Sequence, residues 1–258
     1  DLMQRKGAYP PPSGYSPFIP GLEFAGVVEA AGSECSKVKA GMRVCGITAG
    51  EAQAEFLLID ERLLIETPEC LSDIEAAAMP ETFITAHDAV FAQAAISSGE
   101  RLLIHAVGSG VGLSALQMAA AKDITVIGTS RTADKLERCR EHGLAVGIAA
   151  DDLDAMAETV IENGGADVVL DLVGGPYIKH DLRCMNKLGR LMIVGLTAGS
   201  SADVDLGLVL RKRLKLIGTN LRSRTVEEKA AATNAFCEEF LPLIEAGEIK
   251  PVIDRIVE

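Results

Sequence analysis

Three glycines and a serine stand together within the segment LLIHAVGSGVGLSALQMAA, residues 102–120. An apolar run of strand length precedes the turn GSGVG (108–112), and a segment with apolar residues at helical spacing follows it. Glycine lets a backbone approach a ligand closely, and unpaired N–H groups at the start of a helix attract anions. A strand, a glycine turn and a helix in this order are typical of a binding site for the pyrophosphate of a dinucleotide.

The spacing of the glycines leaves three interpretations open. The turn reads G-S-G-V-G, which departs from the strict G-x-G-x-x-G pattern of dinucleotide-binding proteins. It is also similar to the turn that binds adenosylmethionine in methyltransferases. A tight strand–helix turn without a ligand is the third interpretation. The end of the next strand discriminates between the two ligands.

NAD-specific dehydrogenases and methyltransferases both place a carboxylate there, which accepts hydrogen bonds from ribose hydroxyls. Ser130 occupies that position here, and Arg131 and Lys135 follow it. A hydroxyl and two cations suit a 2′-phosphate, because Arg and Lys form charge-assisted hydrogen bonds with phosphate oxygens. We therefore expect NADPH as the cofactor. The alternative is that Arg131 and Lys135 only form the solvated start of a helix.

The elements that must position these residues follow two patterns along the chain. Up to residue 66 the sequence is rich in Gly and Pro, and short β-like runs predict a small barrel or sandwich. These runs are EFAGVVEAAG, GMRVCGI and AEFLLID. From residue 101 onward, apolar strands alternate with helices, which predicts a parallel sheet covered on both faces. The predicted strands are RLLIHAV, ITVIGTS, AVGIA, DVVLDLV, RLMIVGL and LKLIGTN, and a further helix is predicted in TVEEKAAATNAFCEEFLPLIEAG.

Composition and charge narrow the class of protein. The chain has 258 residues, is 48% hydrophobic and carries a net charge of −12. We expect a soluble, cytoplasmic globular protein with small-molecule partners, no nucleic-acid surface and no membrane segment. The six cysteines form no CxxC pair, which favours reduced thiols. The chain opens at Asp1 in the middle of a pattern, so we expect it to lack upstream residues.

The sequence lacks the residue patterns that other kinds of catalysis require. The four histidines lie far apart without a metal-binding spacing, and Ser109 has no G-x-S-x-G context. His105 interrupts an apolar strand, and we expect it to be a structural histidine with satisfied nitrogens rather than a base.

The chain resembles the medium-chain dehydrogenase/reductase superfamily and, more narrowly, its zinc-free NADPH:quinone oxidoreductases of the tumour-suppressor-inducible and zeta-crystallin-like type. The resemblance covers essentially the whole chain. The stretches that carry it are DLMQRKGAYPPP, PGLEFAGVVEAAG, AAAMPETFITAHDAVF, HAVGSGVGLSALQMA, DVVLDLVGGPY and DLGLVLRKRLKLIGTNLRSRT.

The resemblance implies an α/β fold in two domains, with substrate bound in the cleft between them. A GroES-like, β-rich catalytic domain would occupy residues 1–84 and lack its N-terminal strand. A Rossmann cofactor domain with a doubly wound parallel sheet would occupy residues 85–221. Residues 222–258 would return to the catalytic domain and lack the C-terminal tail. The resemblance also implies a homodimer or homotetramer.

The resemblance also implies roles for single residues. Tyr9 would lie beside the nicotinamide and the substrate, either to polarise the substrate or to orient the cofactor; alternatively, it only caps the Pro-rich turn. The pyrophosphate turn would consist of Gly108, Ser109, Gly110 and Val111, and the 2′-phosphate site of Ser130, Arg131 and Lys135. Adenine, ribose and nicotinamide would lie over strand ends at Val173, Gly195, Leu196 and Leu221.

The chain departs from its wider superfamily in the segment GLEFAG. Leu22 stands where zinc-dependent alcohol dehydrogenases carry a His ligand, and the cysteine-rich structural zinc lobe is missing. Leucine cannot bind a metal, so we expect catalysis without one. Within the narrower family, Ser109 replaces a common Gly, and Ala150 stands where a Tyr is frequent.

These features together predict an NADPH-dependent reductase that transfers hydride to quinones or α,β-unsaturated carbonyls. The alternatives are an enoyl reductase acting on a thioester and a non-catalytic NADPH-binding protein. A methyltransferase is disfavoured by Ser130 and by the position of the turn behind a β-rich segment.

Overall fold

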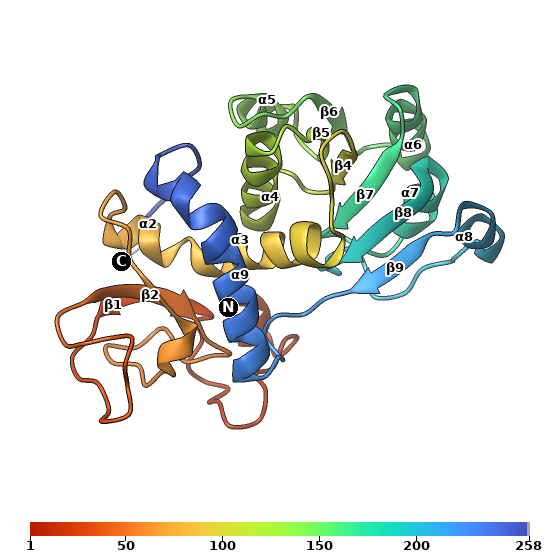
Figure 1. Cartoon of the computed structure of the whole chain (residues 1–258). Helices are drawn as coiled ribbons and strands as arrows, with labels where there is room; N and C mark the ends of the chain where they lie inside the picture. Colours follow the sequence, from red (N-terminus) through yellow and green to blue (C-terminus); the bar gives the residue numbers. More distant parts are fainter. Residues whose placement is uncertain (257–258) are drawn as a thin grey trace. The chain divides into compact units, whose positions relative to one another are not determined.

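The computed structural model describes residues 1–256, which form two compact units. The first unit combines Asp1–Thr85 with the segment that begins at Asn220, and the second unit is Ala86–Thr219. Figure 1 shows their helices and strands along the chain.

The first unit contains a three-stranded antiparallel sheet in the order β1-β2-β3. Its strands are β1 (Glu23–Val27), β2 (Arg43–Ile47) and β3 (Leu64–Glu66). In the central strand, Cys45 pairs with Ala25 and with Ile65. The helices of the unit are α1 (Leu2–Arg5), η1 (Glu61–Leu63), α2 (Asp73–Ala77), α3 (Pro80–His87) and α9 (Val226–Glu245).

The prediction of one strand in this unit is wrong. The run AEFLLID, residues 54–60, has no strand, although its apolar residues favour one. A strand requires a neighbour that completes its hydrogen bonds, and the ladder β1-β2-β3 contains none for this segment. Phe56 and Leu58 are consequently exposed, at 77% and 100% of their surface.

The second unit is built on a six-stranded parallel sheet in the order β6-β5-β4-β7-β8-β9. Its strands are β4 (Arg101–Ile104), β5 (Thr125–Ser130), β6 (Val146–Ala149), β7 (Ala166–Asp171), β8 (Met185–Ile193) and β9 (Lys215–Gly218). Its helices are η2 (a π-helical segment, Asp88–Gln93), α4 (Gly110–Ala121), α5 (Ala133–Arg140), α6 (Leu153–Glu162), α7 (Tyr177–Cys184) and α8 (Leu206–Lys212). All six strands predicted from apolar runs are therefore present, and the doubly wound parallel sheet is confirmed.

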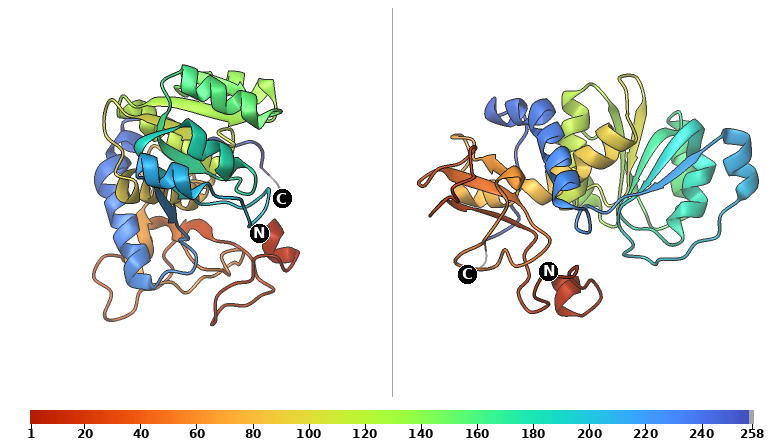
Figure 2. Two further views of the ribbon diagram at one scale, coloured as in Figure 1. Left: turned by 90° about the vertical axis from the view of Figure 1, so that its right-hand side faces the viewer. Right: turned by 60° about the horizontal axis from the view of Figure 1, so that its bottom comes forward.

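The strand order reverses direction beside β4, which places helices on both faces of the sheet (Figure 2). The face that carries α6 and α7 is packed with apolar side chains that have almost no solvent exposure. Among them are Leu103, Ile127, Val169 and Leu191 from the sheet and Met156, Val160, Ile178 and Leu182 from the helices. This core fixes the carboxyl ends of the strands, at which ligands bind in open α/β sheets.

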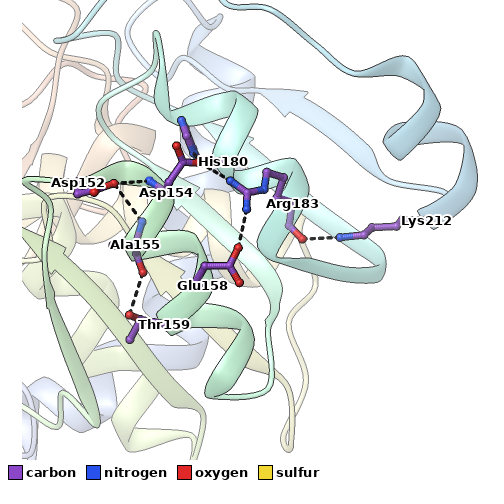
Figure 3. Close-up of polar contacts among 8 residues, drawn as sticks. All are labelled: Asp152, Asp154, Ala155, Glu158, Thr159, His180, Arg183 and Lys212. Carbon is purple, nitrogen blue, oxygen red and sulfur yellow. Dashed lines mark hydrogen bonds and ion pairs between the residues drawn. The ribbon is translucent and has the colours of Figure 1, made fainter.

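Charged side chains join α6 to α7 at the surface (Figure 3). Arg183 of α7 forms ion pairs with Asp154 and with Glu158, the second at 2.6 Å. Asp152 caps α6 by accepting hydrogen bonds from the N–H groups of Asp154 and Ala155. These contacts are largely exposed, so we assign them to helix positioning rather than to large stabilisation.

Two carboxyl groups of the first unit hold protons unusually tightly. Burial raises the pKa of Glu23 to about 7, against the hydrogen bond that its carboxylate accepts from Glu81 N–H at 2.9 Å. Burial and the charge of Glu23 raise the pKa of Glu81 to about 7 as well, although Lys229 and Arg222 oppose this. Because both pKa values exceed their unfolded values, the folded state is favoured by protonation at this site.

This pair predicts a specific pH dependence of stability. The stabilising contribution is complete below the unfolded pKa, near 4.5, and is lost as the pH rises to about 7. In a Glu23→Gln/Glu81→Gln double variant, we expect the free energy of unfolding to resemble wild type near about pH 5. Near about pH 8 it should exceed wild type by on the order of 2 kcal/mol. Urea unfolding at both pH values measures this. The exposed Glu66→Gln serves as control, and an equal difference at both pH values would contradict the assignment.

Candidate active site

The glycine turn lies between the carboxyl end of β4 and the amino end of α4. Ser109 is the N-cap of α4, and its Oγ accepts a hydrogen bond from Gly112 N–H at 3.3 Å. The first N–H groups of a helix have no acceptor within that helix. Gly110 and Val111, which begin α4, therefore offer donors to an anion, and Gly110 is exposed to solvent.

Close packing requires a glycine at Gly112. A Cβ atom at Gly112 would lie 2.6 Å from Val107 O and 2.7 Å from Ala106 O, so only glycine lets α4 approach the end of β4 this closely. A Cβ atom at Gly108 would lie 3.3 Å from Cβ and Cδ of Lys135. The side chain of Lys135 thus runs directly past the glycine turn.

The residues expected at a 2′-phosphate lie at the end of the neighbouring strand. Ser130 ends β5, and its Oγ accepts a hydrogen bond from Thr132 N–H at 3.3 Å. Arg131 follows β5 and Lys135 belongs to α5, and both are exposed. The second unit therefore brings a donor-rich turn, a hydroxyl and two cations to one edge of its sheet, an arrangement that fits a diphosphate with a further phosphate beside it.

The carboxyl ends of β7 and β8 lie on the same side of the sheet as the glycine turn. Asp171 ends β7 and its carbonyl accepts hydrogen bonds from Val194 and Gly195 N–H groups. Val173 O accepts a hydrogen bond from Ala198 N–H at 2.8 Å, which joins the turn after β7 to the turn after β8. Val173, Gly195 and the half-exposed Leu196 are thereby brought together in one strip of backbone.

Tyr9 and Leu221 belong to the first unit. The guanidinium of buried Arg222 lies 4.6 Å from the centroid of the Tyr9 ring and donates to Tyr9 O at 2.9 Å. Arg222 also donates to Ala49 O at 2.9 Å, so the segment around Tyr9 is held firmly. Asn220 Nδ2 donates to Tyr9 Oη at 3.5 Å. The phenol hydrogen of Tyr9 is thus left for another acceptor.

The sequence by itself does not single out Arg222 or Asn220 as neighbours of Tyr9. They lie 213 and 211 residues from Tyr9 along the chain, so no local spacing connects them with it. The only signal was their place in the stretch LIGTNLRSRT that contributed to the family resemblance.

A pocket of about 410 Å³ in the second unit lies at the amino ends of the strands, opposite the glycine turn. It is lined by residues that end α6 and α7 or precede strands, including Gly165, Arg183 and Lys212. Two of its basic groups already have partners: Lys212 Nζ donates to three carbonyls at the end of α7, and Arg183 is paired with carboxylates (Figure 3). We therefore place the candidate site at the glycine turn.

The described part of the chain, residues 1–256, lacks two features that would indicate other kinds of site. No group of three or more His, Cys, Asp or Glu side chains is arranged to hold a metal ion there. In the same part of the chain, no helix has the length and apolar character needed to cross a membrane.

Family models match both parts of the chain. The alcohol dehydrogenase GroES-like domain matches residues 1–69, and the zinc-binding dehydrogenase domain matches residues 110–236. The second match begins at Gly110, within the glycine turn, and includes Ser130, Arg131 and Lys135.

Individual relatives and solved structures agree with these matches. Quinone oxidoreductase-like protein 2 of Bos taurus is 30% identical over 94% of this chain, which spans 70% of that relative. The structure of Escherichia coli quinone oxidoreductase complexed with NADPH has a TM-score of 0.84 and 31% identity, covering 98% of this chain and 78% of that one. The structure of CurK enoyl reductase has a TM-score of 0.78 and 26% identity, covering 90% and 69%. The chain belongs to the quinone oxidoreductase family of the medium-chain dehydrogenase/reductase superfamily.

Proposed function

We propose that this protein binds NADPH and transfers hydride to quinones or related α,β-unsaturated carbonyl compounds without a metal. The observation that carries the proposal is the grouping of the glycine turn with Ser130, Arg131 and Lys135 at one edge of the parallel sheet. The similarity to a quinone oxidoreductase complexed with NADPH supports the same cofactor here.

The residues of the second unit bind and orient the cofactor. Backbone N–H groups of Gly110 and Val111 hold the pyrophosphate at the start of α4. Ser130, Arg131 and Lys135 hold the 2′-phosphate. Val173, Gly195 and Leu196, which follow β7 and β8, would hold the remaining parts of the cofactor, and we propose the same role for Leu221.

The chemistry needs little from the side chains beyond positioning. The nicotinamide of bound NADPH supplies the hydride, and a quinone is a strong acceptor for it. Reduction to the hydroquinone also requires a proton and puts negative charge on a carbonyl oxygen. Tyr9 donates a hydrogen bond to that oxygen from its free phenol hydrogen, which stabilises the developing charge.

An enoyl reductase is the second candidate function, and the similarity to CurK enoyl reductase favours it. Both reactions use the same cofactor site and deliver hydride to a carbon conjugated with a carbonyl. They differ in the acceptor, which is a thioester in the second case.

Cofactor binding tests the proposal before any substrate is known. We expect NADPH fluorescence to change on titration with the protein and to show saturable binding, with weaker binding of NADH and none of adenosylmethionine. Calorimetry with the same three compounds provides an independent measure. Binding of adenosylmethionine without NADPH would contradict the proposal.

Independence from metal gives a separate prediction. Leu22 occupies the position of a superfamily zinc ligand and offers no donor atom. We expect desalted protein to contain zinc far below one equivalent and its activity to survive chelators unchanged. Stoichiometric zinc in elemental analysis, with loss of activity on chelation, would contradict this.

The surface of the second unit supports a homodimer. β9 is the edge strand of the sheet, and Leu206 and Leu210 of α8 are 74% and 78% exposed. An unpaired strand edge beside exposed leucines favours association with a second copy.

We place the protein in the cytoplasm, since all six cysteines are free thiols.

Sedimentation measures the association. We expect wild type to sediment as a dimer and Leu210→Glu as a monomer, because the new charge would be buried without a partner. Ile161→Glu introduces the same change at an exposed site on α6 and should leave the dimer intact. A monomeric wild type would refute the interface.

A further inference from the structure

Buried groups of His105 join the carboxyl ends of three adjacent strands of the six-stranded sheet, β5, β4 and β7. His105 directly follows β4 and has no solvent exposure. Its Nδ1 lies 3.0 Å from Thr129 Oγ1 of β5, and its Nε2 lies 2.7 Å from Asp181 Oδ1 of α7. Its backbone N–H donates to Leu170 O of β7 at 3.1 Å. One histidine thus connects β4 with both neighbouring strands and with a helix.

The surroundings of His105 favour its charged form. Burial by itself lowers the pKa of His105, but the charge and hydrogen bond of Asp181, together with the charge of Asp171, raise it above its usual value. Both ring N–H groups then donate, one to Asp181 and one to Thr129. The edge of Tyr177 completes the enclosure, with ring centroids 4.7 Å apart and an interplanar angle of 72°.

Asp171, whose charge acts on His105, extends the network electrostatically to the turn after β7. Its Oδ1 accepts hydrogen bonds from the N–H groups of Val173 at 2.8 Å and Gly174 at 2.9 Å. Asp171 and Asp181 are fully buried, and the Oδ2 atom of each has no hydrogen-bond partner among the described residues. Two such carboxyl groups depend on the nearby imidazolium for compensating charge.

Each strand that the network joins leads directly into the proposed cofactor site. Gly108 stands three residues after His105, Ser130 follows Thr129, and Val173 stands two residues after Asp171. The turn after β4 also contains Ala106 in the left-handed region, at φ +52°, a conformation that a non-glycine residue adopts only when its neighbours hold it there. Ala106 is held in this conformation by the contacts of His105 before it and by the hydrogen bond from Val107 N–H to Thr129 O after it.

We propose that His105, Asp181, Asp171 and Thr129 form a positioning network that holds the pyrophosphate turn, the 2′-phosphate strand end and the turn after β7 in fixed mutual register. The inference rests on the proposed NADPH site and adds its internal support. None of these four side chains touches the cofactor in this account; they act through Gly108, Ser130 and Val173.

Three variants separate positioning from general stability. Asp181→Asn keeps the shape of the side chain and removes its charge, whereas Thr129→Val removes only the link to β5. Leu182→Ala is the matched control, because it removes buried volume from the same helix without altering the network. Each is compared with wild type by melting temperature and by fluorescence titration with NADPH and with NADH.

We expect Asp181→Asn to raise the dissociation constants for NADPH and NADH together, roughly tenfold, because a charge-assisted bond that orders all three segments is lost. Thr129→Val should raise the constant for NADPH about fivefold and that for NADH less, because Ser130 adjoins the lost link. Leu182→Ala should lower the melting temperature and leave both constants near wild type.

The pH profile gives a readout that stability alone would not move. Binding of NADPH to wild type should weaken as the pH rises through the pKa of His105, because the imidazolium is then lost. In Asp181→Asn that weakening should occur at lower pH, since burial is no longer opposed by the carboxylate. Leu182→Ala should keep the wild-type profile.

The outcomes distinguish this inference from the function on which it rests. A wild-type protein that binds no NADPH would overturn both. If wild type binds NADPH while Thr129→Val and Asp181→Asn bind it as tightly as Leu182→Ala, the positioning network is refuted and the cofactor site stands. If Asp181→Asn does not fold, Thr129→Val decides between these outcomes alone.

Discussion

Replacing both cations beside Ser130 should abolish the preference of this protein for NADPH over NADH. In Arg131→Ala/Lys135→Ala, we expect the KM for NADPH to rise ten- to a hundredfold and the KM for NADH to change little. In the proposed site, the two cations serve only the 2′-phosphate of the cofactor. Charge-assisted hydrogen bonds contribute roughly 1.5–3 kcal/mol each. Both side chains are exposed, so solvent screening reduces this to about one to two factors of ten in affinity.

A matched control shares the helix and the loss of charge. Arg138→Ala/Arg140→Ala removes two cations from the far end of α5 and should leave both KM values near wild type. Steady-state kinetics with each cofactor measures the four constants. An equal loss of affinity for NADPH and NADH in the first double variant would show that these residues do not face a 2′-phosphate.

Removing one hydroxyl from Tyr9 should slow the chemical step. We expect Tyr9→Phe to lower kcat ten- to a hundredfold while the KM for NADPH and the melting temperature stay near wild type. The ring and its contact with Arg222 are kept, and Asn220 loses only a long hydrogen bond. The lost group is the donor that we assign to the substrate oxygen in the transition state.

The same variant distinguishes the other roles considered for Tyr9. A higher KM for NADPH with unchanged kcat would assign the hydroxyl to cofactor orientation. Wild-type values of both constants would reduce Tyr9 to a cap of the Pro-rich turn. Tyr15→Phe, which removes a hydroxyl from the same stretch of sequence, is the control and should behave as wild type.

Apolar periodicity predicts the second unit well because its central strands β5, β4 and β7 are buried on both faces. Four of the six predicted runs, those over β4, β7, β8 and β9, continue past the carboxyl end of the strand, because their last residues form the following turn. RLLIHAV illustrates this: β4 ends at Ile104, and Ala106 already adopts a left-handed conformation. The run AEFLLID shows the limit of the method, since apolar residues cannot report whether a neighbouring strand exists to receive them.

Part of the candidate site could likewise be predicted from the sequence, and part could not. Local spacing was sufficient to select the glycine turn and the group at Ser130, Arg131 and Lys135, which the fold brings to one sheet edge. The support of these residues could not be predicted, because it depends on contacts between distant segments. Thr129 and Asp181 meet at His105 from sequence separations of 24 and 76 residues. A buried histidine inside an apolar run was the only local sign of that network.

The most direct test of the central claim is the oxidation of NADPH by chelator-treated protein in the presence of quinones, α,β-unsaturated ketones and enoyl thioesters. We expect oxidation that depends on an added quinone or enone, is saturable in both substrates, and yields the reduced acceptor in one-to-one ratio with the NADPH consumed. Turnover of enoyl thioesters alone would assign the protein to the enoyl reductases. Protein that binds NADPH and oxidises it with none of these acceptors would contradict the proposed activity.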